Sequence, residues 1–358
     1  MKSTAVAIDL FAGGGGLSLG LKTAGFVVSA AVEIEDAAAD TYEANHPGTV
    51  LFRRDIREVS AIELIRTSPT GKIDLIAACP PCQGFSSLTS KYKRVDSRNE
   101  LIFEFVRLAV KIKPAMIMME NVPGLAKKGA PIFDDAMRKL RSAGYKIRYK
   151  IVDVADFGVP QRRKRLVVFG SLQHEVEIPM RTHSAKPTES TLPWATVRDA
   201  ISERPKPVTL EKAMASGGPS VHDWHVVRSM SDTTLERLRA TKPGRPRSEL
   251  PKSLRPACHR SSNIGFTNVY GRMAWDQPAP TITGGCTTLS KGRFGHPALL
   301  RTISLREAAL LQSFPPSYKF KTDHMEKVCN IVGNALPPRF AHAMAIACLE
   351  QVMNQRKE

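Results

Sequence analysis

The sequence predicts an α/β protein, in which helices cover both faces of a parallel sheet. Three observations lead to this fold class. Between residues 4 and 171, apolar runs rich in Val, Ile and Ala alternate with amphipathic runs. The apolar runs are almost continuous, as strands buried on both faces are. The amphipathic run at 99–113 repeats its apolar residues every three or four positions, which is the period of a helix that covers a sheet.

Each element has its own signal. Apolar runs predict strands at residues 4–12, 26–34, 72–79, 115–122, 145–154 and 165–171, with one shorter strand before Asp55. Amphipathic runs predict helices at residues 16–25, 36–46, 99–113, 130–144, 304–314 and 337–353. The last helix carries Pro337 and Pro338 in its first turn, where proline is tolerated.

The alternation stops after Ser171, and a second unit is expected there. Of the 25 prolines, 11 lie between Pro187 and Pro280, and residues 181–300 hold 18 Lys or Arg against 9 Asp or Glu. This segment is either a solvated, loop-rich insertion or a nucleic-acid-binding surface. The predicted boundaries are 1–175 for a first domain, 176–300 for a smaller, irregular domain, and 301–358 for a C-terminal segment that returns to the first domain.

Composition and charge narrow the class of protein. Of the 358 residues, 42% are hydrophobic and 24% are charged, which excludes collagen, coiled coil and wholesale disorder. The formal net charge of +18 indicates a polyanionic partner. Asp9 interrupts the apolar N-terminal run, and no stretch reaches the roughly 18 apolar residues of a membrane span. A cytoplasmic protein without membrane association is therefore expected, with its six cysteines as free thiols.

A glycine-rich turn, Asp9-Leu-Phe-Ala-Gly-Gly-Gly-Gly-Leu-Ser-Leu-Gly20, follows the first predicted strand. Glycine lets the backbone approach a ligand closely at the start of a helix, so a nucleotide-like cofactor is expected. The turn does not match the GxGxxG pattern, which argues against NAD. Glu33, at the end of the second strand, is placed to accept from two ribose hydroxyls, and Asp55 from an exocyclic amine. The set suits an adenosine without a pyrophosphate.

Cys82 is a candidate nucleophile. It lies in Pro80-Pro81-Cys82-Gln83-Gly84-Phe85-Ser86, directly after the strand at 72–79 and beside the expected cofactor. The alternative is a redox pair formed by Cys79 and Cys82. Zinc would need further ligands at a matching spacing, which the sequence does not offer, so no metal is expected.

A nucleophilic thiol needs positive charge nearby and an acid for the charge that develops on its substrate. Glu120 ends the strand at 115–122, at the same edge of the predicted sheet. In Gln161-Arg162-Arg163-Lys164-Arg165, strand alternation puts Arg163 and Arg165 on one face. A structural carboxylate and a solvated charge cluster stay open as alternatives for these two segments.

In chain order, DLFAGGGGLSLGL, Glu33, Asp55, PPCQGFS, DSRNELIFEF, ENVPG, QRRKR and GNALPP closely resemble the motifs of the DNA (cytosine-5)-methyltransferase family, prokaryotic type. The resemblance covers residues 4–171 and 298–350, and the basic segment between them resembles that family's variable target-recognition region. It implies the Rossmann-like sheet of S-adenosylmethionine-dependent methyltransferases, with a smaller, irregular target-recognition domain.

The resemblance also implies catalytic and DNA-binding roles. Cys82 would attack carbon 6 of cytosine, Glu120 would hydrogen-bond or protonate ring nitrogen 3, and Arg165, with Arg163, would bind near the carbonyl oxygen. A Thr-aliphatic pair is typical of the recognition region, and Thr281-Ile282 is the candidate here, with Thr191-Leu192 as an alternative. The gap left by a flipped-out base would be filled by Gln83 or Ser86.

A further set of residues is implied in binding S-adenosylmethionine, which leaves as S-adenosylhomocysteine. They are Phe11, Ala12, Gly13, Gly14, Gly15, Leu17, Glu33, Ile34, Asp55, Ile56, Pro80 and Asn334.

The implied activity is methyl transfer to carbon 5 of a flipped-out cytosine in a specific sequence of double-stranded DNA, through a covalent Cys82 adduct. Two other functions stay open, a tRNA cytosine-5 methyltransferase and a catalytically silent DNA-binding protein on the same fold. By analogy with the family, we expect a monomeric prokaryotic enzyme, found at the nucleoid when bound to DNA and paired with a restriction endonuclease. No motif predicts the recognition sequence, because base contacts and DNA deformability set it together.

Overall fold

The computed structural model describes residues 4–81, 97–245, 249–256 and 268–356. Contacts divide the chain into two compact units. The first comprises Met1–Phe157, Lys164–Arg181 and Leu336–Glu358, and the second comprises Gly158–Arg163 and Thr182–Ala335. In the residues described, no helix has the length and apolar character needed to cross a membrane.

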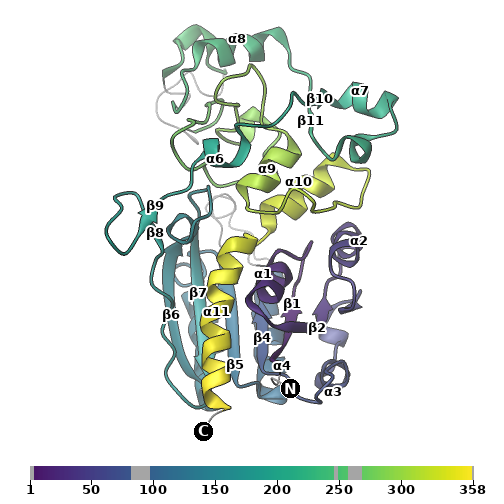
Figure 1. Cartoon of the computed structure of the whole chain (residues 1–358), viewed down its shortest axis with the longest axis vertical. Coiled ribbons are helices and arrows are strands. Elements are labelled where there is room, and N and C mark those ends of the chain that lie inside the picture. The colour runs from purple at the N-terminus through teal and green to yellow at the C-terminus, as the bar shows by residue number, and fades with distance from the viewer. Residues whose placement is uncertain (1–3, 82–96, 246–248, 257–267, 357–358) are drawn as a thin grey trace. The chain divides into compact units, whose positions relative to one another are not determined.

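The described part of the first unit is built on a seven-stranded sheet (Figure 1) with the strand order β3-β2-β1-β4-β5-β7-β6. The first five strands in this order pair in parallel, whereas β7 runs antiparallel to both β5 and β6. The predicted α/β fold class is confirmed. The strands are β1 Val6–Leu10, β2 Val27–Val32, β3 Val50–Phe52, β4 Leu75–Ala78, β5 Met116–Asn121, β6 Lys146–Asp153 and β7 Lys164–Ser171.

The reversed strand β7 differs from the parallel sheet predicted from the sequence. Its cause is the short connection from β6, residues 154–163, because a parallel crossover needs about a dozen residues or more. The reversal brings the first residues of β7 next to the last residues of β5. Since β7 starts where β5 ends, Asn121 pairs with Leu166 and Glu120 pairs with Val167.

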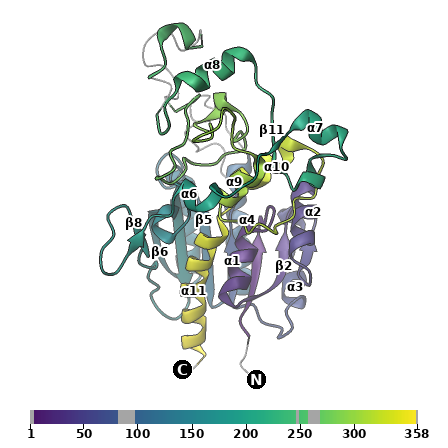
Figure 2. The same ribbon diagram turned by 45° about the horizontal axis from the view of Figure 1, so that its top comes forward.

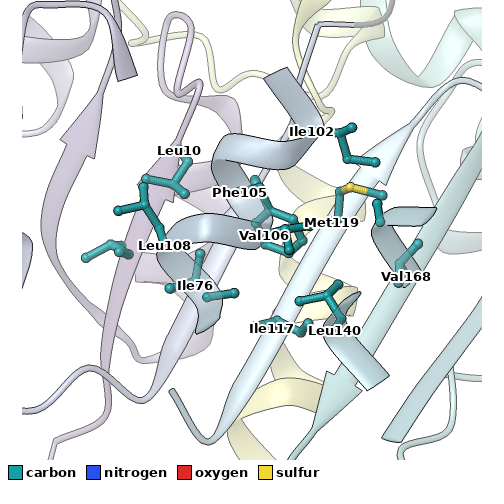
Figure 3. Close-up of a cluster of buried hydrophobic side chains, with 14 of the residues drawn as sticks. Leu10, Ile76, Ile102, Phe105, Val106, Leu108, Ile117, Met119, Leu140 and Val168 are labelled. Carbon is teal, nitrogen blue, oxygen red and sulfur yellow. The ribbon is translucent and has the colours of Figure 1, made fainter. Parts of the chain in front are cut away.

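Helices cover both faces of the sheet, as predicted. One face carries α3, α4 and α5, whose apolar side chains form the main core with alternate residues of the strands (Figure 3). The other carries α1, α2 and α11, and Figures 1 and 2 both show α11 beside α1. Gly20 permits that close approach, because a Cβ there would lie 2.4 Å from the Cβ of Ala341. The helices are α1 Gly16–Ala24, α2 Asp36–Asn45, α3 Ala61–Arg66, α4 Ile102–Ile112, α5 Ala130–Ser142 and α11 Pro338–Gln355.

The second unit consists of short elements joined by long loops. Its helices are α6 Val197–Ile201, α7 Leu210–Ala215, α8 Asp232–Ala240, α9 Leu305–Leu311 and α10 Met325–Asn334. Its strand pairs are β8 His183–Ser184 with β9 Leu192–Pro193, and β10 Val208–Thr209 with β11 Val226–Val227.

Contacts group α9 and α10 with this second unit, although the sequence placed residues 301–358 together in the returning C-terminal segment. The reason is packing, because α9 lies against α6 and its residue Arg306 bonds to Asp223. Within 301–358, the part from Leu336 onward groups with the first unit. The functional boundaries at 175 and 300 stay a prediction.

Candidate active site

The candidate residues of the first unit gather at one edge of its sheet. Strands β1 to β5 are parallel, so their carboxyl ends share this edge, and β7 begins there because it runs the other way. The glycine-rich turn follows β1, Glu33 follows β2 and Asp55 follows β3. Pro80 follows β4, and Glu120 lies near the end of β5. Ligands of open α/β sheets bind at the carboxyl ends of the strands, so this edge is the candidate active site.

The glycine-rich turn is shaped by left-handed backbone conformations. Phe11 has φ 61°, Gly13 has φ 55° and Gly15, which caps α1, has φ 90°. A Cβ at Gly13 would meet no atom within 4 Å, so there is open space beside its backbone. Of the neighbouring candidates, Ala12 is buried and Leu17 packs in the interior of the first unit. The buried Leu17 side chain therefore supports the turn from the interior of the first unit.

Glu33 ties the turn to the end of β2. Its Oε2 accepts a hydrogen bond of 2.7 Å from the Gly13 amide, and its Oε1 accepts from the amides of Ile34 and Glu35 at 2.9 and 2.8 Å. Burial raises the pKa of Glu33, and these three donors oppose that rise. The next residue, Ile34, is an apolar side chain that is 61% exposed. An exposed isoleucine beside a partly buried carboxylate is a suitable wall for a ligand with both a polar and an apolar face.

Asp55 caps the short helix Ile56–Glu58. Its Oδ1 accepts from the Arg57 amide at 2.9 Å, and its Oδ2 pairs with Arg57 Nη1 at 3.3 Å. The Ile56 side chain is buried in the main core, whereas a pocket of about 240 Å³ opens beside Arg57. That pocket is lined by Arg57, Glu100, Leu101, Phe103 and Glu104. Leu101 and Phe103 belong to the motif DSRNELIFEF, which was recognised in the sequence without a site residue being assigned to it.

Glu120 and Arg165 face each other at the start of β7. Arg165 Nε lies 2.5 Å from Glu120 Oε1, and both side chains are largely buried. Burial lowers the pKa of Arg165, and the Glu120 carboxylate opposes that change. The free thiol of Cys79, just after β4, hydrogen-bonds to Glu120, and burial followed by the charge of Glu120 raises its pKa. The structure therefore brings together two of the predicted catalytic residues.

A hydrogen bond next to this pair links the ends of two strands. Asn121 Nδ2 donates to the Pro80 carbonyl at 3.0 Å, which links the end of β5 to the segment that follows β4. The predicted nucleophile Cys82 and the predicted DNA contacts Gln83 and Ser86 lie outside the described residues.

The remaining predicted residues belong to the second unit. Arg163 Nη1 donates to the carbonyls of Ile282 and Gly333, at 2.8 and 3.0 Å. Thr281 is exposed and donates to the Arg162 carbonyl at 2.8 Å, whereas the Ile282 side chain is fully buried. Asn334 is the last residue of α10. The roles of these residues toward cofactor and DNA stay predictions.

Two residues of the first unit, Asp9 and Leu101, were not singled out from the sequence. Asp9 is fully buried on β1, where its Oδ2 accepts from Ser18 Oγ at 2.7 Å, and its Oδ1 has no hydrogen-bond partner among the described residues. Burial raises its pKa to about 7. The sequence signal was a carboxylate inside an apolar strand directly before the glycines. Leu101, the second, gave no such signal because it reads as part of an amphipathic helix.

Comparisons with known proteins agree on one family. The family model for C-5 cytosine-specific DNA methylases matches residues 6–350. Among curated relatives, the Type II methylase M.HgiDII of Herpetosiphon aurantiacus is 36% identical over 94% of this chain and 93% of its own length. The Type II methyltransferase M1.HphI of Haemophilus parahaemolyticus is 34% identical over 97% of this chain and 87% of its own. A prophage-encoded protein of E. coli, described as a DNA modification methyltransferase, superposes with a TM-score of 0.72 at 25% identity, covering 98% of this chain and 100% of its own.

Proposed function

The chain belongs to the family of C-5 cytosine-specific DNA methylases, and from this we propose that it methylates carbon 5 of one cytosine within a specific sequence of double-stranded DNA. The observation that carries the proposal is the ion pair of Glu120 with Arg165. It lies at the sheet edge where the glycine-rich turn begins and where β4 leads toward Cys82. A cofactor, a nucleophile and a polar clamp for a ring can meet at such an edge.

The residues at this edge fit S-adenosylmethionine. Gly13 leaves space beside the backbone, Ile34 offers an apolar surface, and Leu101 and Phe103 line the pocket beside Arg57, which pairs with Asp55. Glu33 already accepts three hydrogen bonds, so Oε2 keeps an acceptor site for a ribose hydroxyl. When bound, the cofactor supplies an electrophilic methyl group on a sulfonium.

The proposed reaction begins at Cys82. Its thiolate adds to carbon 6 of the cytosine, which turns carbon 5 into a nucleophile that can take the methyl group. Glu120 bonds or protonates ring nitrogen 3, while Arg165, held by Glu120, binds near the ring carbonyl. Loss of the carbon-5 proton then expels the thiolate and restores the ring. Because the target carbon lies inside the base stack, the cytosine must first be flipped out, at a cost of a few kcal/mol.

The second unit is proposed as the target-recognition region. Residues 181–300 carry an excess of nine positive charges, which can bind the phosphates of DNA. Contacts with phosphates position a protein on DNA without reading its sequence. The relatives named above are Type II methylases, so we also propose that this protein modifies the sites of a partner restriction endonuclease. Its monomeric state stays a prediction.

A tritium-transfer assay tests the function. Tritiated S-adenosylmethionine is incubated with the protein and with either duplex plasmid DNA or tRNA. Transfer to DNA is expected, transfer to tRNA alone would replace the proposed substrate, and transfer to neither would indicate a silent DNA-binding protein. Cys82→Ala should abolish transfer, and Cys348→Ala, a buried free cysteine on α11, is the matched control that should retain it.

A further inference from the structure

A chain of side-chain amides runs through the interior of the second unit. The Ile282 amide donates to Gln161 Oε1 at 2.7 Å, and Gln161 Nε2 donates to Gln312 Oε1 at 2.6 Å. Gln312 Nε2 then donates to the Val332 carbonyl at 2.6 Å. Both glutamine side chains are fully buried. We call these three consecutive hydrogen bonds the glutamine relay.

The glutamine relay has one polarity. In both glutamines the amide oxygen accepts the hydrogen bond that comes from the Ile282 side, and the amide nitrogen donates the one that leads toward Val332. Turning Gln161 over would place its NH₂ group against the Ile282 N–H, and turning Gln312 over would place its oxygen against the Val332 carbonyl. Buried polar groups without partners cost free energy, so the relay fixes both side chains in a single arrangement.

The backbone at Ile282 is held from its other side as well. Arg163 Nη1 donates to the Ile282 carbonyl and to the Gly333 carbonyl. A Cβ at Gly333 would lie 2.2 Å from the Gly284 amide nitrogen, so this glycine lets the segment lie directly on α10. Ile282 is thus an anchor, while its neighbour Thr281 is exposed.

We propose that Gln161 and Gln312 are positioning residues for target recognition. They hold the peptide at Ile282 and, together with the bond from Thr281 Oγ1 to the Arg162 carbonyl, present the Thr281 side chain in one orientation. The proposal rests on the proposed function and on the prediction from the sequence that Thr281 contacts the target DNA. Discrimination is the difference between the binding free energies at correct and incorrect DNA sites. Binding at the correct site depends more on a fixed geometry of the Thr281 contact than binding at an incorrect site does. Breaking the relay should therefore reduce discrimination more than it reduces the rate of methyl transfer.

The test measures discrimination directly. Bisulfite sequencing of plasmid from cells that express the parent identifies the recognition sequence. The value of kcat/KM is then measured on that duplex and on duplexes with one base pair changed, for the parent, Gln161→Met and Gln312→Met. Methionine keeps the length of the side chain and removes its hydrogen bonds. Gln277→Met, at an exposed glutamine of the same unit, is the control.

Both relay variants should lose about tenfold in the ratio of correct to incorrect kcat/KM, as one lost buried hydrogen bond allows, while kcat per active site changes less than about threefold. The double variant should lose no more than the larger single loss, because the bonds form one unit. Active sites are counted by trapping with 5-fluorocytosine DNA.

An unchanged ratio in folded variants would overturn the proposal, as would equal loss on every duplex together with a lower Tm, which indicates a structural role. Should Gln161→Met not fold, Gln312→Met gives a second test, since it removes the bond that fixes the orientation of the Gln161 amide. Failure of both to fold counts against a positioning role. A parent that methylates no DNA overturns the proposed function instead.

Discussion

Glu120 and Arg165 form a buried ion pair between neighbouring strands, with 2.5 Å between Oε1 and Nε and side chains only 9% and 11% exposed. Two charges at this depth stabilise each other only as a pair, because each has lost much of its hydration. The pair places an acceptor and a fork of donors next to one another. Ring nitrogen 3 and the adjacent carbonyl of neutral cytosine both accept hydrogen bonds, so Arg165 can donate to the carbonyl, whereas Glu120 can bond to nitrogen 3 only through a proton shared between them.

The first prediction follows from this burial. Glu120→Gln and Arg165→Met should each lower the free energy of unfolding by about 3–5 kcal/mol, the range for removing one member of a buried pair. The double variant should lose less than the sum of the two. Urea unfolding measures this coupling, and all three variants should be inactive in methyl transfer. Additive losses, or single variants as stable as the parent, would show that the two charges do not interact.

The second prediction concerns the cofactor carboxylates. Glu33→Ala and Asp55→Ala should each weaken S-adenosylmethionine binding by about 1–3 kcal/mol, the range for hydrogen bonds to charged groups. Calorimetry measures the affinity. Glu58→Ala is the matched control, because Glu58 is an exposed carboxylate three residues after Asp55, and it should bind like the parent. Parental affinity in both test variants would contradict the assigned cofactor site.

The third prediction is a pH dependence that originates at Asp9. Burial raises its pKa to about 7, whereas the carboxyl of an unfolded chain titrates near 3.9. Between about pH 4 and pH 7 the folded protein therefore holds a proton that the unfolded chain has released, so Asp9 lowers the free energy of unfolding as the pH rises through this range. The full loss is about 4 kcal/mol, at about 1.4 kcal/mol per pH unit.

In Asp9→Asn the carboxyl group is replaced by an amide that does not titrate in this pH range. The stability of the variant relative to the parent should therefore increase from pH 4 to pH 8, measured by urea unfolding at each pH. Taking the difference cancels the buried histidines His46 and His296, whose pKa values burial lowers to about 4. Asp134→Asn, at an exposed aspartate, is the control. A flat difference for Asp9→Asn would mean that Asp9 is already ionised in the folded protein.

The fourth prediction concerns the basic segment. Residues 181–300 hold 18 Lys or Arg against 9 Asp or Glu, so DNA binding should release condensed counterions. If about six phosphates are neutralised, the affinity should fall with a log-log slope near −5 between 50 and 200 mM salt. Fluorescence anisotropy on a labelled duplex measures the slope. A slope near zero would exclude this segment as the DNA-binding surface.

Local patterns predicted much of the first unit. The strand that precedes Glu33 and the strand that carries Glu120 were visible as apolar runs, and the rule that parallel strands end at one edge predicted that these residues lie at the same edge. Arg165 reached the same edge for a different reason. Sequence alternation predicted its face of the strand, but only the reversed direction of β7 brings it to Glu120.

Long-range contacts were not predictable in this way. Gln161 meets Ile282 and Gln312 across 121 and 151 positions of sequence, and no local periodicity reports such a contact. The grouping of α9 and α10 with the second unit was missed for the same reason, because their helical patterns do not say which unit they pack on. Thr281 and Ile282 were proposed as a pair, yet one is exposed and the other buried.

The central claim is a covalent bond between Cys82 and carbon 6 of the target cytosine, and trapping that bond tests it most directly. A duplex with 5-fluorocytosine at the methylated position, established beforehand by bisulfite sequencing, is incubated with the protein and S-adenosylmethionine. Thiol addition and methylation can both proceed, but fluorine cannot leave carbon 5 as a cation, so the adduct persists. It should survive denaturing electrophoresis, require the methyl donor, be absent in Cys82→Ala, and map by peptide mass spectrometry to Cys82. No adduct with active enzyme, or an adduct at Cys79, would contradict the mechanism.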